Sequence, residues 1–105
     1  MAISGTSSNI ALSGMQAASL RMQAAAGNTA NRQTEGFARR GVIQSTAADG
    51  GVQARMTTTG ARNDSDGAMV SDAVEAREAA QAFAASTTAL RAREDTLGTL
   101  LDTFA

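Results

Sequence analysis

The chain has 105 residues, of which 43% are hydrophobic but only 3% aromatic, and its formal net charge at pH 7 is −1. This length allows a single domain with a thin interior, and we therefore expect a marginal monomer that gains stability from neighbouring molecules. The small net charge excludes a strong electrostatic attraction to nucleic acid or to an anionic membrane surface.

The first predicted element is a helix that continues to about Asn31. Ser7, Ser8 and Asn9 are candidate N-caps for it. Small and apolar residues then recur at alternating steps of four and three, which is the heptad spacing of a helix that packs lengthwise against a partner. Because most of these residues are alanine, two backbones can approach closely, but little apolar area is buried. This first seam consists of Ala11, Met15, Ala18, Met22, Ala25 and Thr29.

A turn and a hairpin are predicted after this helix. The period is lost after Asn31, and the segment ends on Gly36, which is typical of a helix end followed by a turn. Residues 37–59 include two stretches that tolerate β-structure, and Asp49-Gly50-Gly51 between them favours a hairpin turn. A lone two-stranded hairpin is barely stable in water, so we expect it to pack on the helices or on another copy.

A polar linker over residues 60–67 leads to a second helix, predicted to run from about residue 68 to residue 103. Asp66 is the candidate cap of this helix. Asp72 and Glu75 lie in its first turns, where negative charge complements the helix dipole.

The second helix also carries a heptad seam, which one charged residue, Glu94, interrupts. Phe83 and Phe104 are the bulkiest side chains on it. They fit two interpretations, a place in the protein's own core or a place in grooves on adjacent subunits. The second seam consists of Met69, Ala73, Ala76, Ala80, Phe83, Thr87, Leu90, Glu94, Leu97, Leu101 and Phe104.

Catalytic and metal sites find little support in the composition. The sequence has no His, Cys, Tyr, Trp or Lys, so ten carboxylates are the only candidate acids and bases. The pair Glu75 and Glu78 is typical of a solvated helix face. Residues 64–67 look like the middle of a calcium loop, but Arg62 and Ala73 stand where that loop needs carboxylates. We therefore predict no enzyme, no catalytic residue, no metal site and no cofactor.

Contacts with nucleic acid and with membranes are not predicted either. Arg39-Arg40 beside Phe37 is a basic and aromatic group, but one such group in a slightly acidic chain indicates an interface or surface feature. No run of about eighteen apolar residues is present, so we predict no membrane insertion. Residues 1–14 lack the basic and apolar regions of a cleaved signal peptide.

Two parts of the sequence resemble a known family. Residues 11–15 (ALSGM), Arg21-Met22 and residues 26–40 (AGNTANRQTEGFARR) resemble the N-terminal signature of bacterial flagellar rod and hook proteins. That signature usually has an ALSGL-like start and an ANNIAN-x-NTPGF/Y-x-R-like segment. The second half is similar to the same family's C-terminal segment. The short middle section, with Gly50-Gly51-Val52, is most similar to that of the proximal rod proteins of the C type. The C-terminal similarity lies in Met69-Val70, Val74-Glu75-Ala76, residues 81–85 (QAFAA) and residues 97–101 (LGTLL).

The resemblance implies a mainly α fold. Long N- and C-terminal helices would pack as an antiparallel coiled-coil hairpin, with a short β-hairpin and loop insert between them. Residues 1–36 would form the N-terminal axial helix and turn, residues 37–67 the β-hairpin and polar linker, and residues 68–105 the C-terminal axial helix.

The resemblance also implies a function. The chain would be a structural subunit of the flagellar basal-body rod, a helical tube that spans the periplasm, transmits torque and encloses the export channel. Its partners would be other axial proteins, copies of itself and the flagellar type III export apparatus, through which it would leave the cytoplasm unfolded without a cleaved signal peptide. The turn that locks one subunit to the next would contain Asn28, Ala30, Asn31, Thr34, Gly36 and Phe37.

Two other functional classes have nearly the same physical requirements. One is a soluble helical-hairpin adaptor or export chaperone that holds a partner's helix against the seams. The other is an inner-rod or needle component of a related type III secretion system. Heptad periodicity does not separate these classes from a rod subunit, whereas the turn segment over residues 28–37 favours the rod. We also hypothesise that the monomer is loosely ordered and tightens on assembly, because each helix alone buries little.

Overall fold

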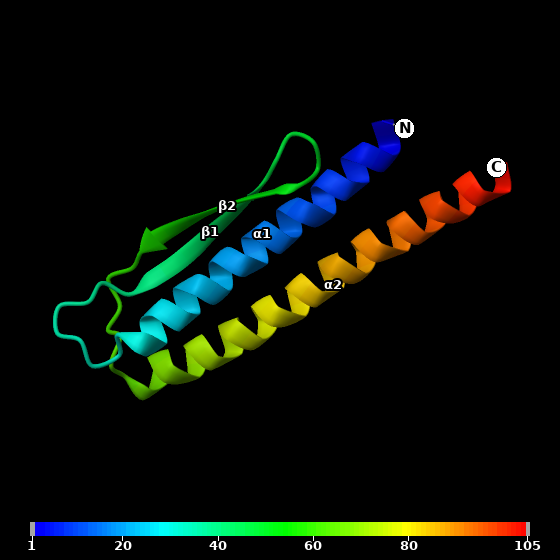
Figure 1. The fold of residues 1–105 in the computed structure, drawn as a ribbon. Helices are drawn as coiled ribbons and strands as arrows, with labels where there is room; N and C mark the ends of the chain where they lie inside the picture. Colours follow the sequence, from blue (N-terminus) through cyan, green and yellow to red (C-terminus); the bar gives the residue numbers. More distant parts are fainter. Residues whose placement is uncertain (1, 105) are drawn as a thin grey trace.

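The computed structural model describes the backbone of residues 2–104 and the side chains of residues 8–104. Its elements follow in the order α1 (Ala2–Ala30), β1 (Arg40–Thr46), β2 (Val52–Thr58) and α2 (Asp66–Phe104). Figure 1 shows α1 lying between the β-hairpin and α2, which runs antiparallel to it. The molecule is elongated, with extents of 62 × 24 × 16 Å. The predicted fold, an antiparallel helical hairpin with a β insert, is confirmed.

α1 ends close to the predicted position but begins earlier than its candidate caps. The N–H of Asn31 closes the last turn on the carbonyl of Gly27 at 3.1 Å. Ser8 and Asn9 lie inside the helix, because no proline interrupts the residues before them and the helical backbone continues back to Ala2. The side chain of Ser7 lies outside the described residues. The prediction of a helix start at these caps is therefore wrong.

The hairpin has the predicted turn. The N–H of Ala47 donates to the carbonyl of Gly51 at 2.8 Å, and Gly50 adopts a φ of +89°, which glycine tolerates without a Cβ clash. β1 and β2 pair antiparallel, with Val42 opposite Met56. The backbone N–H of Val52 donates to Oγ of Ser13 in α1 at 3.1 Å. The hairpin is thus supported by α1 within the same chain.

The sequence predicted Asp66 as the cap of α2, but the residue that caps this helix is Ser65. Oγ of Ser65 accepts a hydrogen bond from the N–H of Ala68 at 3.1 Å, and its carbonyl accepts one from the N–H of Met69 at 3.1 Å. Ser65 therefore satisfies donors that the first helical turn leaves unpaired. Asp66 lies in the first turn of α2, where its negative charge interacts favourably with the positive end of the helix dipole.

The interface between the helices contains small side chains. A Cβ built on Gly14 would lie 2.8 Å from Oγ of Ser86, so the two backbones approach closely there. Among the described side chains, all buried apolar ones are alanines, and the largest fully buried side chain belongs to Asn28. The interior is as thin as the composition predicts. The buried alanines are Ala17, Ala18, Ala24, Ala25, Ala68 and Ala79.

In the part of α2 near the turn, the face that meets α1 lies one position before the predicted second seam. Its buried residues are Ala68, Asp72 and Ala79, whereas Ala73, Ala76 and Ala80 of the predicted seam are exposed. Small residues occur on several sides of this helix, so spacing alone did not show which side turns inward. Phe83, Thr87 and Leu90 of the predicted seam, farther along α2, are half-buried.

The first seam was predicted to pack against a partner helix, and more of its residues are buried than in the second seam. Ala18 and Ala25 are buried, and Met15 and Met22 are half-buried. The neighbouring Ala17 is buried as well, because α1 has the hairpin on one side and α2 on the other. The buried surface of α1 is therefore wider than a single heptad stripe.

Candidate functional site

A group of polar side chains lies where the turn after α1, the start of β1, the linker and α2 meet. Its centre is the carboxylate of Asp72, whose residue is only 3% exposed. Arg39 Nη2 donates to Oδ1 of Asp72 at 2.6 Å and Nη1 donates to Oδ2 at 3.0 Å, while Arg32 Nη2 donates to Oδ2 at 3.1 Å. Two guanidinium groups therefore share one buried carboxylate. This polar cluster consists of Asn28, Arg32, Arg39, Asn63 and Asp72.

Two opposing effects set the pKa of Asp72. Burial disfavours the charged form of the carboxyl group and by itself would raise the pKa. Hydrogen bonds from Arg39 and Asn28, together with the positive charge of Arg39, outweigh burial and lower the pKa below the ordinary value of 3.8. Asp72 is therefore ionised at neutral pH and offsets part of the charge of its two arginine neighbours.

Asn28 joins the start of β1 to α1. Its side chain is 2% exposed; Nδ2 donates to the carbonyl of Arg40 at 2.8 Å, and Oδ1 accepts from the N–H of Arg40 at 2.8 Å. The side-chain amide thus pairs with the backbone of Arg40 as a neighbouring strand would. Nδ2 also lies 3.3 Å from Oδ1 of Asp72, which connects this contact to the rest of the polar cluster.

Asn63 connects the linker to the end of α1. Its Nδ2 donates to the carbonyls of Asn28 and Asn31 at 2.9 and 3.0 Å, and these carbonyls belong to the helix end, which lacks intrahelical donors. Its Oδ1 accepts from Arg39 Nη1 at 3.1 Å, and its own carbonyl accepts from Arg32 Nη1 at 3.2 Å. The side chain thereby contributes to the C-cap of α1 and holds the linker in place.

The residues predicted to form a subunit-interface turn differ in their surroundings. Asn28 is buried, and both polar atoms of its side chain bond within the chain, so it supports the fold. Asn31 is half-buried, and its Nδ2 donates to the carbonyl of Gly27 at 2.9 Å. Its Oδ1 accepts from Thr34 Oγ1 at 3.2 Å. These two asparagines therefore stabilise the turn through hydrogen bonds within the chain.

The other four turn residues are more accessible. Ala30, Thr34 and Gly36 are exposed, and Gly36 has a φ of +74°. Phe37 is half-buried, with the guanidinium carbon of Arg40 5.6 Å from the centre of its ring. The turn therefore offers a surface made of small residues and the edge of one aromatic ring.

Ion pairs between the two helices were not predicted from the sequence. The prediction of a solvated carboxylate pair is wrong for Glu75, which is half-buried and accepts from Arg21 Nε at 2.5 Å. Glu78 is exposed and lies 3.4 Å from Arg21 Nη2. The available signal was that Asp72 and Glu75 occupy the same helical stripe as Ala68 and Ala79. Arg21 on α1 meets Glu75, whereas the arginines that meet Asp72 come after α1.

Comparison with known proteins finds no matching family model, no similar curated protein and no similar solved structure.

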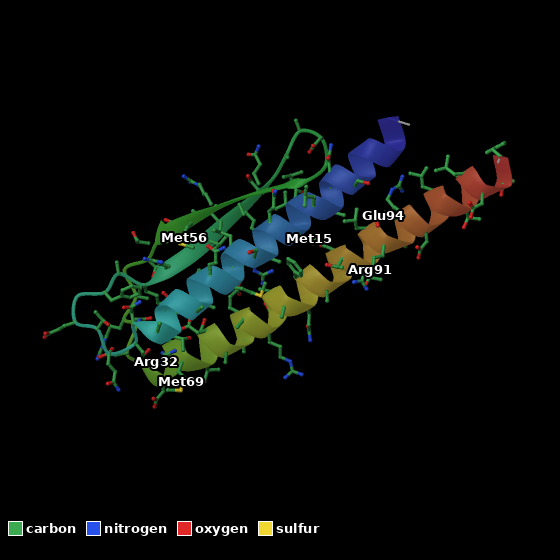
Figure 2. The ribbon with its side chains drawn as sticks, viewed as in Figure 1. Met15, Arg32, Met56, Met69, Arg91 and Glu94 are labelled. Atoms are coloured by element: carbon green, nitrogen blue, oxygen red, sulfur yellow. The ribbon has the colours of Figure 1, made fainter. Side chains whose placement is uncertain are left out.

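An open groove runs between α1 and α2 near the turn. Its volume is about 770 Å³, and alanine and methionine side chains make up most of its wall, with Arg32 and Asp72 as charged members. Figure 2 shows Met69 and Arg32 at this end of the molecule. We call it the helix groove; its apolar lining includes Met22, Ala26, Met69, Ala73 and Ala76.

The far half of α2 presents exposed apolar side chains. Leu97 and Leu100 are 43% and 50% exposed, and Leu101 and Phe104 are 64% and 85% exposed. Figure 1 shows that α1 and α2 lie closer together at the turn than at the end where the chain termini lie. We call Leu97, Leu100, Leu101 and Phe104 the distal stripe. These residues belong to or flank the predicted second seam, and the described part of the chain leaves them largely exposed.

Neither helix of the described chain combines the length and apolar character needed to cross a membrane. The described residues also contain no group of three or more carboxylates that could hold a metal ion.

Proposed function

We propose that this chain is a structural subunit of the bacterial flagellar basal-body rod, which assembles with copies of itself and other axial proteins into a helical tube. The observation that carries the proposal is the segment over residues 26–40. Its family-like signature coincides with the turn and polar cluster that join the two helices. An adaptor that only holds a partner's helix has no need of this segment.

The shape and surface of the molecule support an assembling subunit. The molecule is 62 Å long, and the buried apolar side chains in its described part are all alanine. Such a thin helical hairpin buries little apolar area by itself, so contacts with lateral neighbours add to its stability. The distal stripe would expose Leu101 and Phe104 to water in an isolated molecule. Burial of such side chains against neighbouring subunits stabilises an assembly.

The proposal includes the cellular location and the route to it. The subunit would be exported by the flagellar type III apparatus without a cleaved signal peptide and would act in the rod across the periplasm. The absence of cysteine is compatible with passage of an unfolded chain, because no disulfide can form before assembly.

The test is the composition of detergent-washed basal bodies from the bacterium that encodes the chain. An epitope-tagged chain should co-purify with the basal bodies, and deletion of its gene should abolish motility. A tagged chain found only in the cytoplasm with an exported protein would favour the adaptor class, and one found in needle complexes would favour the injection system.

Two turn variants sharpen this test. Phe37→Ala removes the ring at the turn surface, and Gly36→Val places a β-branched residue at a φ of +74°, so each should stop rod assembly and motility while export continues. Gly60→Val is the matched control, because Gly60 is exposed and a Cβ there meets nothing within 4 Å. Normal motility in both Phe37→Ala and Gly36→Val would remove the assignment of the turn.

A further inference from the structure

The distal stripe has the spacing of a helix that enters a groove. Leu97, Leu100, Leu101 and Phe104 stand at positions i, i+3, i+4 and i+7, which places them on one face of α2. Amphipathic helices insert side chains at this spacing into apolar grooves of their partners. All four side chains are between 43% and 85% exposed, so no side chain within residues 8–104 covers them fully.

The helix groove is suited to receive such a face. Alanines such as Ala26, Ala73 and Ala76 leave room between the two helices for larger side chains from outside. Met22 and Met69 at its wall are flexible and polarisable, so they adapt to the shape of an inserted leucine or phenylalanine. A volume of about 770 Å³ accommodates several apolar side chains.

The charges beside the two surfaces are complementary. Residues 94–104 contain Glu94, Asp95 and Asp102 and no basic residue. Arg77 follows Ala76 and lies one turn beyond Ala73, next to the lining of the helix groove; it is exposed and forms no ion pair within the described residues. Figure 2 shows Glu94 on the far half of α2, away from the groove end marked by Met69. The carboxylates of this acidic helix end and the exposed guanidinium of Arg77 attract each other.

The distal stripe cannot occupy the groove of its own molecule. Both surfaces involve α2, a continuous helix over Asp66–Phe104. Ala76 and Leu101 are 25 residues apart on it, which corresponds to about 38 Å along a straight helix at 1.5 Å per residue. An unbroken helix does not fold back on itself, so the stripe can fill such a groove only on another molecule.

We propose that the distal stripe of one molecule docks in the helix groove of a second copy of this chain, with the acidic residues 94–102 near Arg77 of that copy. The inference rests on the proposed function and deepens it, because it names the surfaces by which copies join. The two surfaces differ and lie at opposite ends, so the contact is heterologous. Each added copy exposes a new groove or stripe, and such contacts produce open chains or helical assemblies.

Two variants of the full chain separate the surfaces. Leu101→Gln with Phe104→Gln removes apolar side chains from the stripe and leaves the groove intact. Ala76→Glu places a charge in the groove and leaves the stripe intact. The controls are Thr99→Gln with Thr103→Gln for the stripe and Ala85→Glu for the groove, all at exposed positions off the second seam. Far-ultraviolet circular dichroism verifies that each variant keeps the helical content of the wild type.

The decisive measurement is sedimentation velocity of each protein alone and of mixtures. We expect wild type and controls to form concentration-dependent oligomers, and each surface variant to associate at least about tenfold more weakly. An equimolar mixture of the stripe variant and the groove variant should form a one-to-one dimer and nothing larger, because one intact groove meets one intact stripe. A two-fold contact or unspecific aggregation does not give this result.

Cysteine cross-linking tests the same contact directly, because the natural sequence contains no cysteine. The double variant Ala76→Cys with Leu101→Cys should give a ladder of disulfide-linked oligomers on mild oxidation. The single variants mixed together should give mainly heterodimers.

Several results would overturn the inference. These are a wild type that stays monomeric at millimolar concentration, a mixture that stays monomeric, and control variants that weaken association as much as the surface variants. A groove that binds only the helix of a different protein would also contradict it. If the chain associates in solution as described but is absent from basal bodies, only the proposed function is refuted. If the chain is present in basal bodies but does not associate through the stripe and the groove, only the docking mode is refuted.

Discussion

Nη2 of Arg39 donates to Oδ1 of Asp72 at 2.6 Å across 33 residues of sequence, and this contact joins the approach to β1 to the first turns of α2. Arg32, from the turn after α1, binds the other carboxylate oxygen. Three segments of a chain whose buried apolar side chains are small therefore meet at one buried charge. The polar cluster fixes the closed end of the helical hairpin in the place where a larger protein would use leucine or phenylalanine.

Replacing the central carboxylate should destabilise the chain. Asp72→Asn keeps the shape of the side chain but leaves Arg32 and Arg39 close together without their counter-charge. We expect the free energy of unfolding to fall by about 2–4 kcal/mol, because one partner of a largely buried ion pair is removed. Urea unfolding followed by circular dichroism measures this. Asp64→Asn is the control, since Asp64 pairs with Arg62 on the surface, and it should leave stability unchanged.

Acid should weaken the fold through the same residue. The pKa of Asp72 is lower in the folded chain than its ordinary value of 3.8, so its ionised form stabilises the fold above that pH. This contribution is lost as the pH falls from about 4 through the lower folded pKa. Urea unfolding between pH 7 and pH 3 should show a decrease in stability that begins near pH 4. The decrease should be smaller in Asp72→Asn, and an identical acid dependence in both proteins would contradict the assignment.

Asn28 should be needed to hold the hairpin against α1. Asn28→Ala removes both hydrogen bonds to Arg40 and leaves the N–H and carbonyl of that residue without these partners. We expect a loss of about 2–3 kcal/mol and faster hydrogen exchange at the Arg40 amide. Asn9→Ala, at an exposed position of α1, should have a much smaller effect on both measurements.

Two exposed glycines should respond differently to the same substitution. Gly36 has a φ of +74° and Gly60 does not adopt a positive φ, while a Cβ on either meets nothing within 4 Å. Gly36→Ala should therefore lower the free energy of unfolding by about 1 kcal/mol through backbone strain alone. Gly60→Ala should be neutral or slightly stabilising, because alanine restricts the unfolded chain. Equal effects in thermal melts of the two variants would show that the backbone of Gly36 is not strained.

The close approach of the helices should appear as coupling between Gly14 and Ser86. Alanine at position 14 improves helix propensity by about 1 kcal/mol, but its Cβ would lie 2.8 Å from Oγ of Ser86. Gly14→Ala should therefore stabilise the chain by about 1 kcal/mol only when Ser86→Ala is also present. A double-mutant cycle by urea unfolding should give a coupling of at least about 0.5 kcal/mol. Additive effects would mean that the helices are not in contact at this point.

The local features of the chain were determined by its sequence. The ends of α1 and α2 near the turn, the hairpin and its Asp49-Gly50 turn were predictable, because glycine, short polar side chains and helical periodicity act over a few neighbouring residues. The predicted turn after Asn31, which ends on Gly36, lies between α1 and the hairpin.

The tertiary structure alone decided which side of α2 faces inward and what lies at the closed end. Alanines occur on several sides of α2, so the sequence did not show whether the face with Ala73 and Ala76 or the face with Ala68 and Ala79 turns inward. The roles of Asp72 and Asn28 depend on partners that are 12 to 44 residues away in sequence. Such partners meet only when the two helices and the hairpin are assembled, and no local pattern of residues encodes that meeting.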